Sequence, residues 1–179
     1  VAESGTLIAD IIDTFLPKGW FPYVTPGTKF VTLGGAIACD VHGKNHHKEG
    51  SFGNYINWIE IINEKNEVIK CSPSENSELF HWTIGGMGLT GIIIRCAIQL
   101  KKVESGWIKQ NTIVNNNLKE TLQSFYDYQD ATFSVAWIDC LATGKSFGRS
   151  ILMIGEHAKE DELYAKTIIY PKRKNQKIS

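Results

Sequence analysis

The sequence predicts an α+β fold of one or two domains. Apolar residues recur at helical spacing near the N-terminus, whereas later segments are short β-rich runs bounded by polar turns. Hydrophobic residues make up 42% of the 179 residues, which is enough to build a buried core. Two glycine-rich runs, 31–54 and 85–93, interrupt these elements and contain most of the residues able to contact a ligand.

In the first part of the chain, periodicity and turn residues define the expected elements in order. Ile8, Ile11, Ile12 and Phe15 repeat at helical spacing, and the residues from Pro17 onward end that helix. The expected elements are a helix over 8–16, a strand over 20–24, a turn over 25–28, a hairpin of strands 56–62 and 67–71, a helix over 78–84 and a strand over 92–100.

A composition shift at residues 101–106 predicts a boundary, with one domain over 1–103 and a second over 104–179. The second part is expected to contain strands over 107–114, 132–138 and 149–155 and a helix over 118–128. Asn117 followed by Glu120 resembles a capping box at the start of that helix. This β-α-β-β order predicts the beginning of an α+β domain.

Charge and cysteine usage exclude several classes of function. Lys+Arg and Asp+Glu balance at 19 each, so the chain has no net field to attract nucleic acid or an anionic membrane, and the basic stretch 171–177 is interpreted as solvated. No apolar run is long enough to span a membrane, and no signal peptide is recognisable. The four cysteines are far apart, which predicts free thiols, two of them buried, in a reducing, cytoplasmic environment.

The first glycine-rich run combines glycines with histidines, lysines and asparagines. Glycine lets a main chain approach a diphosphate or a ring edge closely, so this composition indicates a ligand site. A second run at 85–93 repeats the chemistry. His42 and Lys44 are separated by one glycine, so on an extended backbone their side chains would lie on the same side.

These two runs, with Pro26, Gly27 and Thr28 and the segment 78–80, resemble the FAD-binding domain of the PCMH-type flavoproteins of the vanillyl-alcohol-oxidase superfamily. Within that superfamily they are similar to the decaprenylphosphoryl-β-D-ribose 2′-oxidase family. The resemblance is strong over about residues 5–100 and weaker through 134–137 and 148–149. It implies non-covalent FAD and the oxidation of a hydroxyl on a sugar or sugar-like alcohol, including one linked to a polyprenyl phosphate. A reductase or epimerase subunit is the partner that it implies.

The resemblance also implies which segments and residues serve the cofactor. Family members carry a diphosphate-wrapping loop upstream of the position of Val1 and most of the substrate domain downstream of Ser179, so we expect an internal fragment. His42 and Lys44 are the expected catalytic pair, and Gly43, Lys44 and Trp137 the expected substrate pocket. The residues expected to contact FAD, largely through the main chain, are Gly27, Thr32, Leu33, Gly34, Gly35, Cys39, Asp40, Val41, His42 and Ile93.

Other interpretations remain open at this point. Three closely spaced histidines suggest a metal site, but Gly43 lies between His42 and His46 and no carboxylate cluster is near, so we expect no metal. His46 and His47 are expected to bind backbone carbonyls instead. Trp137 could equally be a core aromatic on a strand. The whole chain could be a non-catalytic FAD- or nucleotide-binding protein, or a structural fragment without a ligand.

Overall fold

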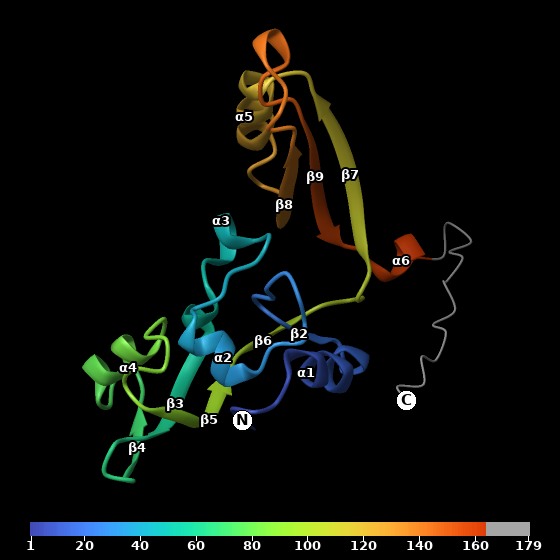
Figure 1. The fold of residues 1–179 in the computed structure, drawn as a ribbon. Helices are drawn as coiled ribbons and strands as arrows, with labels where there is room; N and C mark the ends of the chain where they lie inside the picture. The colour runs from blue at the N-terminus through green and yellow to red at the C-terminus, as the bar shows by residue number, and fades with distance from the viewer. Residues whose placement is uncertain (164–179) are drawn as a thin grey trace, which may run out of the picture.

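The computed structural model describes residues 1–163, which form two lobes, each built on an antiparallel sheet (Figure 1). The first lobe (residues 2–102) contains β1 (Ala2–Glu3), α1 (Ile8–Phe15), β2 (Trp20–Pro22), α2 (Leu33–Ala38), α3 (His46–Glu49), β3 (Ile56–Ile62), β4 (Val68–Cys71), α4 (Ser77–Thr83), β5 (Ile92–Ile98) and β6 (Leu100–Lys102). The second lobe (residues 108–163) contains β7 (Ile108–Asn115), α5 (Leu118–Asp127), β8 (Phe133–Ile138), β9 (Ser150–His157) and α6 (Glu160–Leu163). The basic stretch 171–177 lies outside the described residues.

The first lobe is organised around a four-stranded sheet in the order β1-β5-β3-β4, with all neighbours antiparallel. Alternate residues of β3, Ile59 and Ile61, are fully buried, as the two-residue period of a strand requires. Leu33 and Ile37 of α2 join the same core, as does Ile8 of α1. The predicted hairpin is therefore confirmed, and its apolar face fixes the position of α2.

Helix α1 occupies the segment that its periodicity predicted. Ile8 and Ile11 are buried, and the helix continues into a 3₁₀ turn over Leu16–Lys18. Gly19 follows with φ 78°, a left-handed conformation that glycine adopts without steric cost, and its N–H donates to the Leu16 carbonyl at 3.0 Å. The glycine thus ends the helix and turns the chain into β2.

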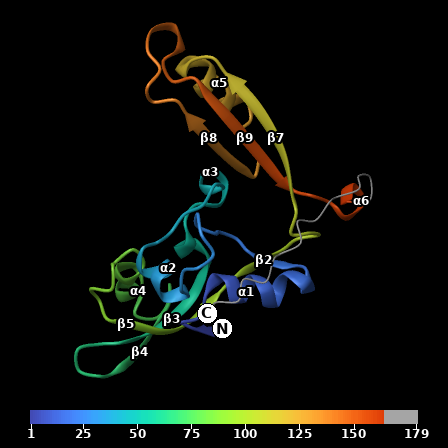
Figure 2. The same ribbon diagram turned by 45° about the vertical axis from the view of Figure 1, so that its right-hand side comes forward.

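The second lobe is a three-stranded sheet in the order β7-β9-β8 with α5 packed on one face (Figures 1 and 2). The predicted cap is present, because the Asn117 side chain accepts from the Glu120 N–H at 3.0 Å. Glu120 in turn accepts from the Asn116 N–H at 2.8 Å, one residue earlier than in a standard capping box. On the face covered by α5, the Thr121 and Ser150 hydroxyls are buried and lie 2.8 Å apart.

One expectation about the strands is wrong in detail, and the glycine-rich run contains helices that were not expected. The single strand expected over 92–100 is two strands, because the Gln99 N–H donates to the Tyr55 carbonyl at 2.8 Å and the next residues pair with β2 instead. The glycine-rich run 31–54, for which no helix was expected, contains α2 and α3. In helix α2, local hydrogen bonding outweighs the low helix propensity of two adjacent glycines.

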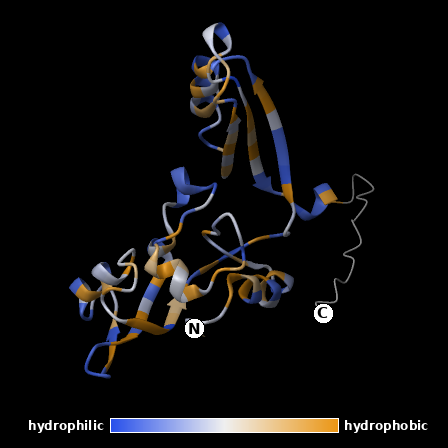
Figure 3. Cartoon of the chain, viewed as in Figure 1, coloured by the Kyte–Doolittle hydropathy of each residue, from blue (hydrophilic) through white to orange (hydrophobic). Residues whose placement is uncertain are grey.

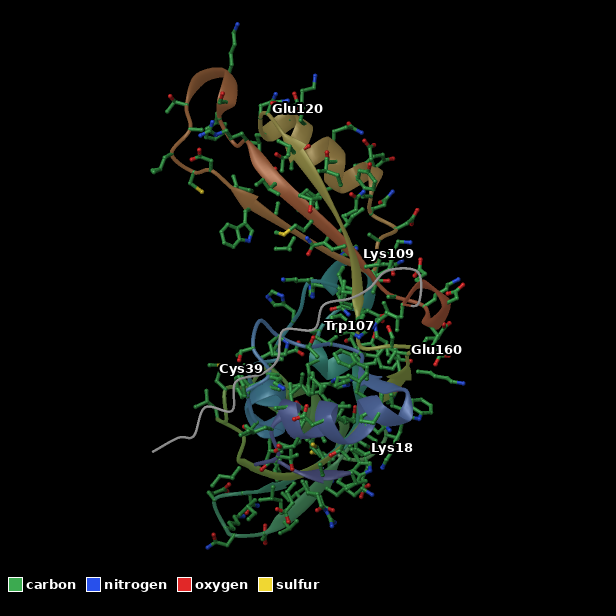
Figure 4. The ribbon with its side chains drawn as sticks, turned by 90° about the vertical axis from the view of Figure 1, so that its right-hand side faces the viewer. Lys18, Cys39, Trp107, Lys109, Glu120 and Glu160 are labelled. Carbon is green, nitrogen blue, oxygen red and sulfur yellow. The ribbon has the colours of Figure 1, made fainter. Side chains whose placement is uncertain are left out.

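The lobes meet at the linker after β6 and at α3. Figures 1 and 2 both place α3 next to the start of β8, and Figure 3 shows α3 as hydrophilic, in contrast to β5. Figure 4 shows Trp107 and Lys109 where the chain passes into the second lobe. Among residues 1–163, no helix has the length and apolar character needed to cross a membrane.

Candidate functional site

Helix α2 is the first part of the candidate site, and Thr32 caps it. The Thr32 hydroxyl accepts from the Gly35 N–H at 3.1 Å, which satisfies one of the free donors of the first turn. Gly34 packs against Ser4, because a Cβ on Gly34 would lie 3.0 Å from the Ser4 Cβ. Gly35 faces outward and is exposed. The two glycines therefore have different roles: Gly34 serves packing within the lobe, and only Gly35 presents open backbone.

Most main-chain N–H groups of this run already have acceptors inside the chain. The N–H of Leu33 donates to Thr6, that of Gly34 to Ser4 and that of Cys39 to Gly35, at 2.9, 2.8 and 3.0 Å between N and O. Asp40 and Val41 donate to carbonyls of α2, at 3.0 and 3.1 Å. A cofactor lying on this surface would therefore meet glycine α-carbons and exposed side chains rather than free N–H groups of these residues.

The second glycine-rich run lies against the end of α2. The Gly85 N–H donates to the Ile37 carbonyl at 3.0 Å, and the Met87 N–H donates to the Ala38 carbonyl at 2.8 Å. Asp40, with φ 41°, accepts from the Gly53 N–H at 2.8 Å and turns the chain away from the helix. Tertiary structure thus brings together the two runs that the sequence linked only by composition.

His42 and Lys44 follow this turn in a loop that faces the second lobe. Both side chains are exposed, and the His42 and His46 rings lie 5.1 Å apart between centroids. Gly43 between them packs so closely on the Thr25 carbonyl that a Cβ there would clash with its oxygen. The turn at 25–28 therefore holds the His42–Lys44 segment by backbone contact.

Lys44 lines a cavity of about 290 Å³ between the lobes. Its carbonyl accepts from the Ser134 N–H of β8 at 2.9 Å, so its main chain is attached to the sheet of the second lobe. The cavity walls are mainly apolar, with a few polar groups, as in small-molecule sites. Other residues that line it are Phe21, Thr25, Gln110, Phe133, Val135, Met153 and His157.

Three other predicted residues lie apart from this cavity. Trp137 is 75% exposed near the far end of β8 and lines a separate surface hollow with Arg149 and Ile151. The Ile93 side chain is buried in the core of the first lobe, opposite Ile61. Gly27 lies in an exposed turn where a Cβ would meet nothing within 4 Å.

A half-buried cluster of Glu49, Tyr55 and Lys101 lies at the C-terminal end of α3. Tyr55 donates to a Glu49 carboxylate oxygen at 2.6 Å, and Lys101 lies 3.3 Å from the other oxygen. Burial opposes ionisation of Glu49, but the Tyr55 hydroxyl and the Lys101 charge outweigh it and lower its pKa. Burial and the hydrogen bond to Glu49 raise the pKa of Tyr55. Glu49 is therefore a carboxylate that fixes the end of α3.

His157 marks the other contact between the lobes. Its ring lies edge-on to Phe21 of the first lobe and Phe133 of the second, with centroid distances of 5.4 and 5.5 Å. Its Nδ1 donates to the Ser105 carbonyl at 3.1 Å. Burial lowers the pKa of His157 and outweighs the opposing effect of that carbonyl, which keeps the ring neutral near neutral pH.

Sequence reasoning missed several residues that shape this site. Asn45 is 1% exposed, and its amide donates to the Tyr23 carbonyl at 2.7 Å. Glu49 and Lys101 are 52 positions apart, and no sequence signal pairs them. Asn45 offered only a weak signal, as a turn-forming residue directly after Lys44. The expectation that histidines bind carbonyls is confirmed for His47, whose Nε2 lies 2.8 Å from the Ala131 oxygen.

The residues of this site suit a metal ion and a flavin to different degrees. Over residues 1–163, no group of three or more His, Cys, Asp or Glu side chains could hold a metal ion. Gly35, Cys39 and His42 are exposed, and the one atom within 4 Å of a Cβ added to Gly35 is the Thr32 hydroxyl oxygen. Exposed glycine backbone allows a ligand ring to approach closely, so these residues are compatible with a flavin.

Comparison with known proteins adds independent information. No protein-family model matches the chain. It is 39% identical over 167 residues to decaprenylphosphoryl-β-D-ribose oxidase of Mycolicibacterium smegmatis, covering 92% of the chain and 36% of that protein. Cytokinin dehydrogenase 9 of Oryza sativa subsp. japonica is 36% identical over 86 residues, covering 48% of the chain and 15% of that protein. Cytokinin dehydrogenase 5 of Arabidopsis thaliana is 32% identical over 103 residues, covering 54% of the chain and 18% of that protein. The chain thus spans about a third of the oxidase and less of the dehydrogenases.

Proposed function

The chain belongs to the FAD-binding PCMH-type family that includes decaprenylphosphoryl-β-D-ribose oxidase and the cytokinin dehydrogenases, and from this membership we propose a function in FAD-dependent alcohol oxidation. The proposed substrate is a hydroxyl on a sugar or sugar-like alcohol, including one carried on a polyprenyl phosphate. A reductase or epimerase subunit would consume the product. The observation that carries the proposal is the position of Lys44, exposed on a cavity between the flavin-type loop and the sheet of the second lobe.

We divide the proposed roles between the lobes. Residues 1–103 would form the flavin-ring side of the FAD domain, and residues 104–179 would begin the substrate domain. Gly27, Gly35, Cys39 and His42 would hold FAD through their exposed atoms, and the buried Ile93 would support this surface from within the core. Thr32, Leu33, Gly34, Asp40 and Val41 would shape the cofactor surface through their internal hydrogen bonds.

The chemistry follows from what these residues can do. The chemistry that FAD would supply when bound is that of a two-electron acceptor, with transfer of a hydride to flavin N5. The Lys44 ammonium can donate hydrogen bonds to a substrate oxygen and stabilise negative charge on it. The exposed His42 imidazole does not line this cavity, but it is two residues away from Lys44 in the same loop and can hold or transfer a proton. Apolar side chains such as Phe133 and Met153 line the same cavity and would exclude water from it.

The test is spectroscopic and uses the full-length protein. Absorption bands at about 370 and 450 nm after purification would identify an oxidised flavin. Acid precipitation then separates the two modes of attachment, because non-covalent FAD stays in the supernatant and covalent FAD stays with the pellet. We expect the supernatant to be yellow.

Anaerobic addition of sugar alcohols and polyprenyl-phosphate sugars completes the test. If one of these compounds bleaches the band at about 450 nm, it is a substrate that reduces the flavin. A protein that binds flavin but is never reduced would be a non-catalytic FAD protein. A full-length protein that holds no flavin, even when refolded with FAD, would overturn the proposal.

A further inference from the structure

The segment from Gly43 to Glu49, a short loop that continues into α3, is attached to both lobes. Its contacts with the first lobe are made by Gly43, Asn45 and Glu49. Gly43 packs on the Thr25 carbonyl, and the Asn45 amide donates to the Tyr23 carbonyl at 2.7 Å. These contacts are partly or fully buried, which indicates that the loop is a fixed part of the first lobe.

Its contacts with the second lobe come from the residues between these anchors. The Lys44 carbonyl accepts from the Ser134 N–H at 2.9 Å, where β8 begins. The His47 Nε2 lies 2.8 Å from the Ala131 oxygen, and the Lys48 ammonium donates to the Asp130 oxygen at 2.6 Å. Both acceptors are carbonyls, so both side chains act as donors. Three bonds therefore join this short segment to the second lobe, two at the turn that leads into β8 and one at β8 itself.

The turn that receives these bonds is itself anchored. The Ala131 N–H donates to the Tyr128 carbonyl at 3.0 Å, and the Thr132 N–H donates to the Glu156 carboxylate of β9 at 2.6 Å. The Thr132 hydroxyl donates to the same carboxylate at 2.5 Å. The carbonyls of Asp130 and Ala131 are thus held in position by the turn and by β9.

We propose that His47 and Lys48 form a latch that holds the Lys44 main chain on β8 and so sets the separation of the lobes at the cavity. His47 and Lys48 are positioning residues, because they act through Lys44 and Ser134 and do not line the cavity. The second point of contact, at Phe21 and His157, lies on the linker side of the same cavity. With the latch open, the lobes would still meet there and at Lys101, whose ammonium lies 5.6 Å from the centroid of the Phe133 ring, but the side of the cavity at Lys44 would lose its support. The role of the latch in catalysis rests on the proposed function; the latch itself does not.

Exposed hydrogen bonds contribute little to global stability, so the latch should be detected by local exchange. The test is hydrogen–deuterium exchange of the full chain, followed in peptides covering 42–50 and 129–136. Each lost bond should speed exchange in both segments by up to about tenfold, the scale of a single hydrogen bond. The variants are His47→Ala, Lys48→Ala and the double variant, and we expect the double variant to exchange fastest.

Two further variants make the result specific. His47→Gln keeps a side-chain N–H donor and should restore protection near Ala131, which a general loss of packing would not allow. His81→Ala, an exposed histidine of α4, should leave both segments unchanged. Wild-type exchange of the 129–136 peptide in the double variant would overturn the latch.

The same variants in FAD-loaded full-length protein connect the latch to chemistry. We expect His47→Ala to retain FAD and to be reduced more slowly by substrate, with His47→Gln closer to wild type. Faster exchange with an unchanged reduction rate would overturn the positioning role while leaving the latch. Loss of the proposed function would appear differently, as an absence of flavin in wild type and variants alike.

Discussion

Gly43 lies against the carbonyl oxygen of Thr25 with no room for a side chain between them. This contact joins the turn at 25–28 to the segment that carries His42 and Lys44. Asn45 strengthens the same junction, because its buried amide donates to the Tyr23 carbonyl two residues before Thr25. The loop that faces the second lobe is therefore positioned by main-chain packing on the segment that follows β2.

Replacing Gly43 with alanine should destabilise this junction. The added Cβ would meet a backbone oxygen, which cannot move without shifting the turn, so we expect a loss of about 1–3 kcal/mol in the free energy of unfolding. Urea denaturation of both proteins measures the loss. Gly27→Ala is the matched control, since a Cβ there meets nothing within 4 Å, and its change should stay within about 0.5 kcal/mol. Equal effects of the two substitutions would contradict the close-approach argument.

Replacing Gly35 with alanine should have opposite effects on the free protein and on its complex with FAD. Gly35 occupies the third position of α2, where capping boxes normally carry a side chain. A Cβ there would lie 3.1 Å from the Thr32 hydroxyl, which must shift slightly, so we expect alanine to stabilise the helix by no more than about 0.5 kcal/mol. The same methyl group would project from the surface proposed for the flavin and should weaken FAD binding. Thermal melts with and without FAD measure both effects. An alanine variant that binds FAD as tightly as wild type would place the ring elsewhere.

Replacing Lys44 with alanine should slow flavin reduction while FAD stays bound. Its carbonyl would still accept from Ser134, so the loop should keep its position, whereas the ammonium group at the cavity would be lost. We expect substrate-driven bleaching to slow by about tenfold or more. Stopped-flow absorbance provides the measurement. Lys65→Ala, in the exposed turn between β3 and β4, is the control, and a Lys44 variant as fast as this control would remove the residue from the mechanism.

Glu49 should make stability depend on acid pH. The pKa of Glu49 is lowered from 4.5, since Tyr55 and Lys101 together outweigh the effect of burial. A depressed pKa in the folded state means that the carboxylate stabilises the fold above about pH 4.5 and that this contribution is lost as the pH falls through the folded pKa. Glu49→Gln should therefore cost stability at about pH 6 and much less at about pH 3. Denaturation at both pH values, with Glu64→Gln as an exposed control, tests this, and a pH-independent difference would contradict it.

Two of the four thiols should be reactive, and the other two should be protected. Cys39 and Cys140 are exposed, whereas Cys71 and Cys96 are buried. Burial raises the pKa of each buried thiol to about 11, and the nearby Glu75 adds to the effect at Cys71. Because the thiolate is the reactive form, a disulfide reagent at neutral pH should modify Cys39 and Cys140 quickly and the other two only on unfolding. The absorbance of the thiol that the reagent releases, measured before and after denaturant is added, counts the cysteines that have reacted.

The sequence by itself determined the local elements and the family. The apolar period at Ile8 and Ile11 predicted α1, because a buried face imposes its period on the sequence. Two β-rich runs separated by a polar turn predicted β3 and β4. Asn117 and Glu120 predicted the start of α5 from capping chemistry alone. The glycine-rich runs predicted the family, since backbone that must lie close to other atoms restricts which residues can occupy it.

Only the tertiary structure decided how these parts meet. Nothing in the local sequence distinguishes Gly34, which packs on Ser4, from Gly35, which remains open, because the two glycines differ only in what lies opposite each of them. The bonds from His47 to Ala131 and from Lys101 to Glu49 join positions 84 and 52 residues apart. Local propensity does not depend on residues so far apart in the sequence. These pairs come together only when the sheet of each lobe packs. The cavity beside Lys44 exists for the same reason: its walls come from both lobes, and their contacts at α3 and His157 set its width.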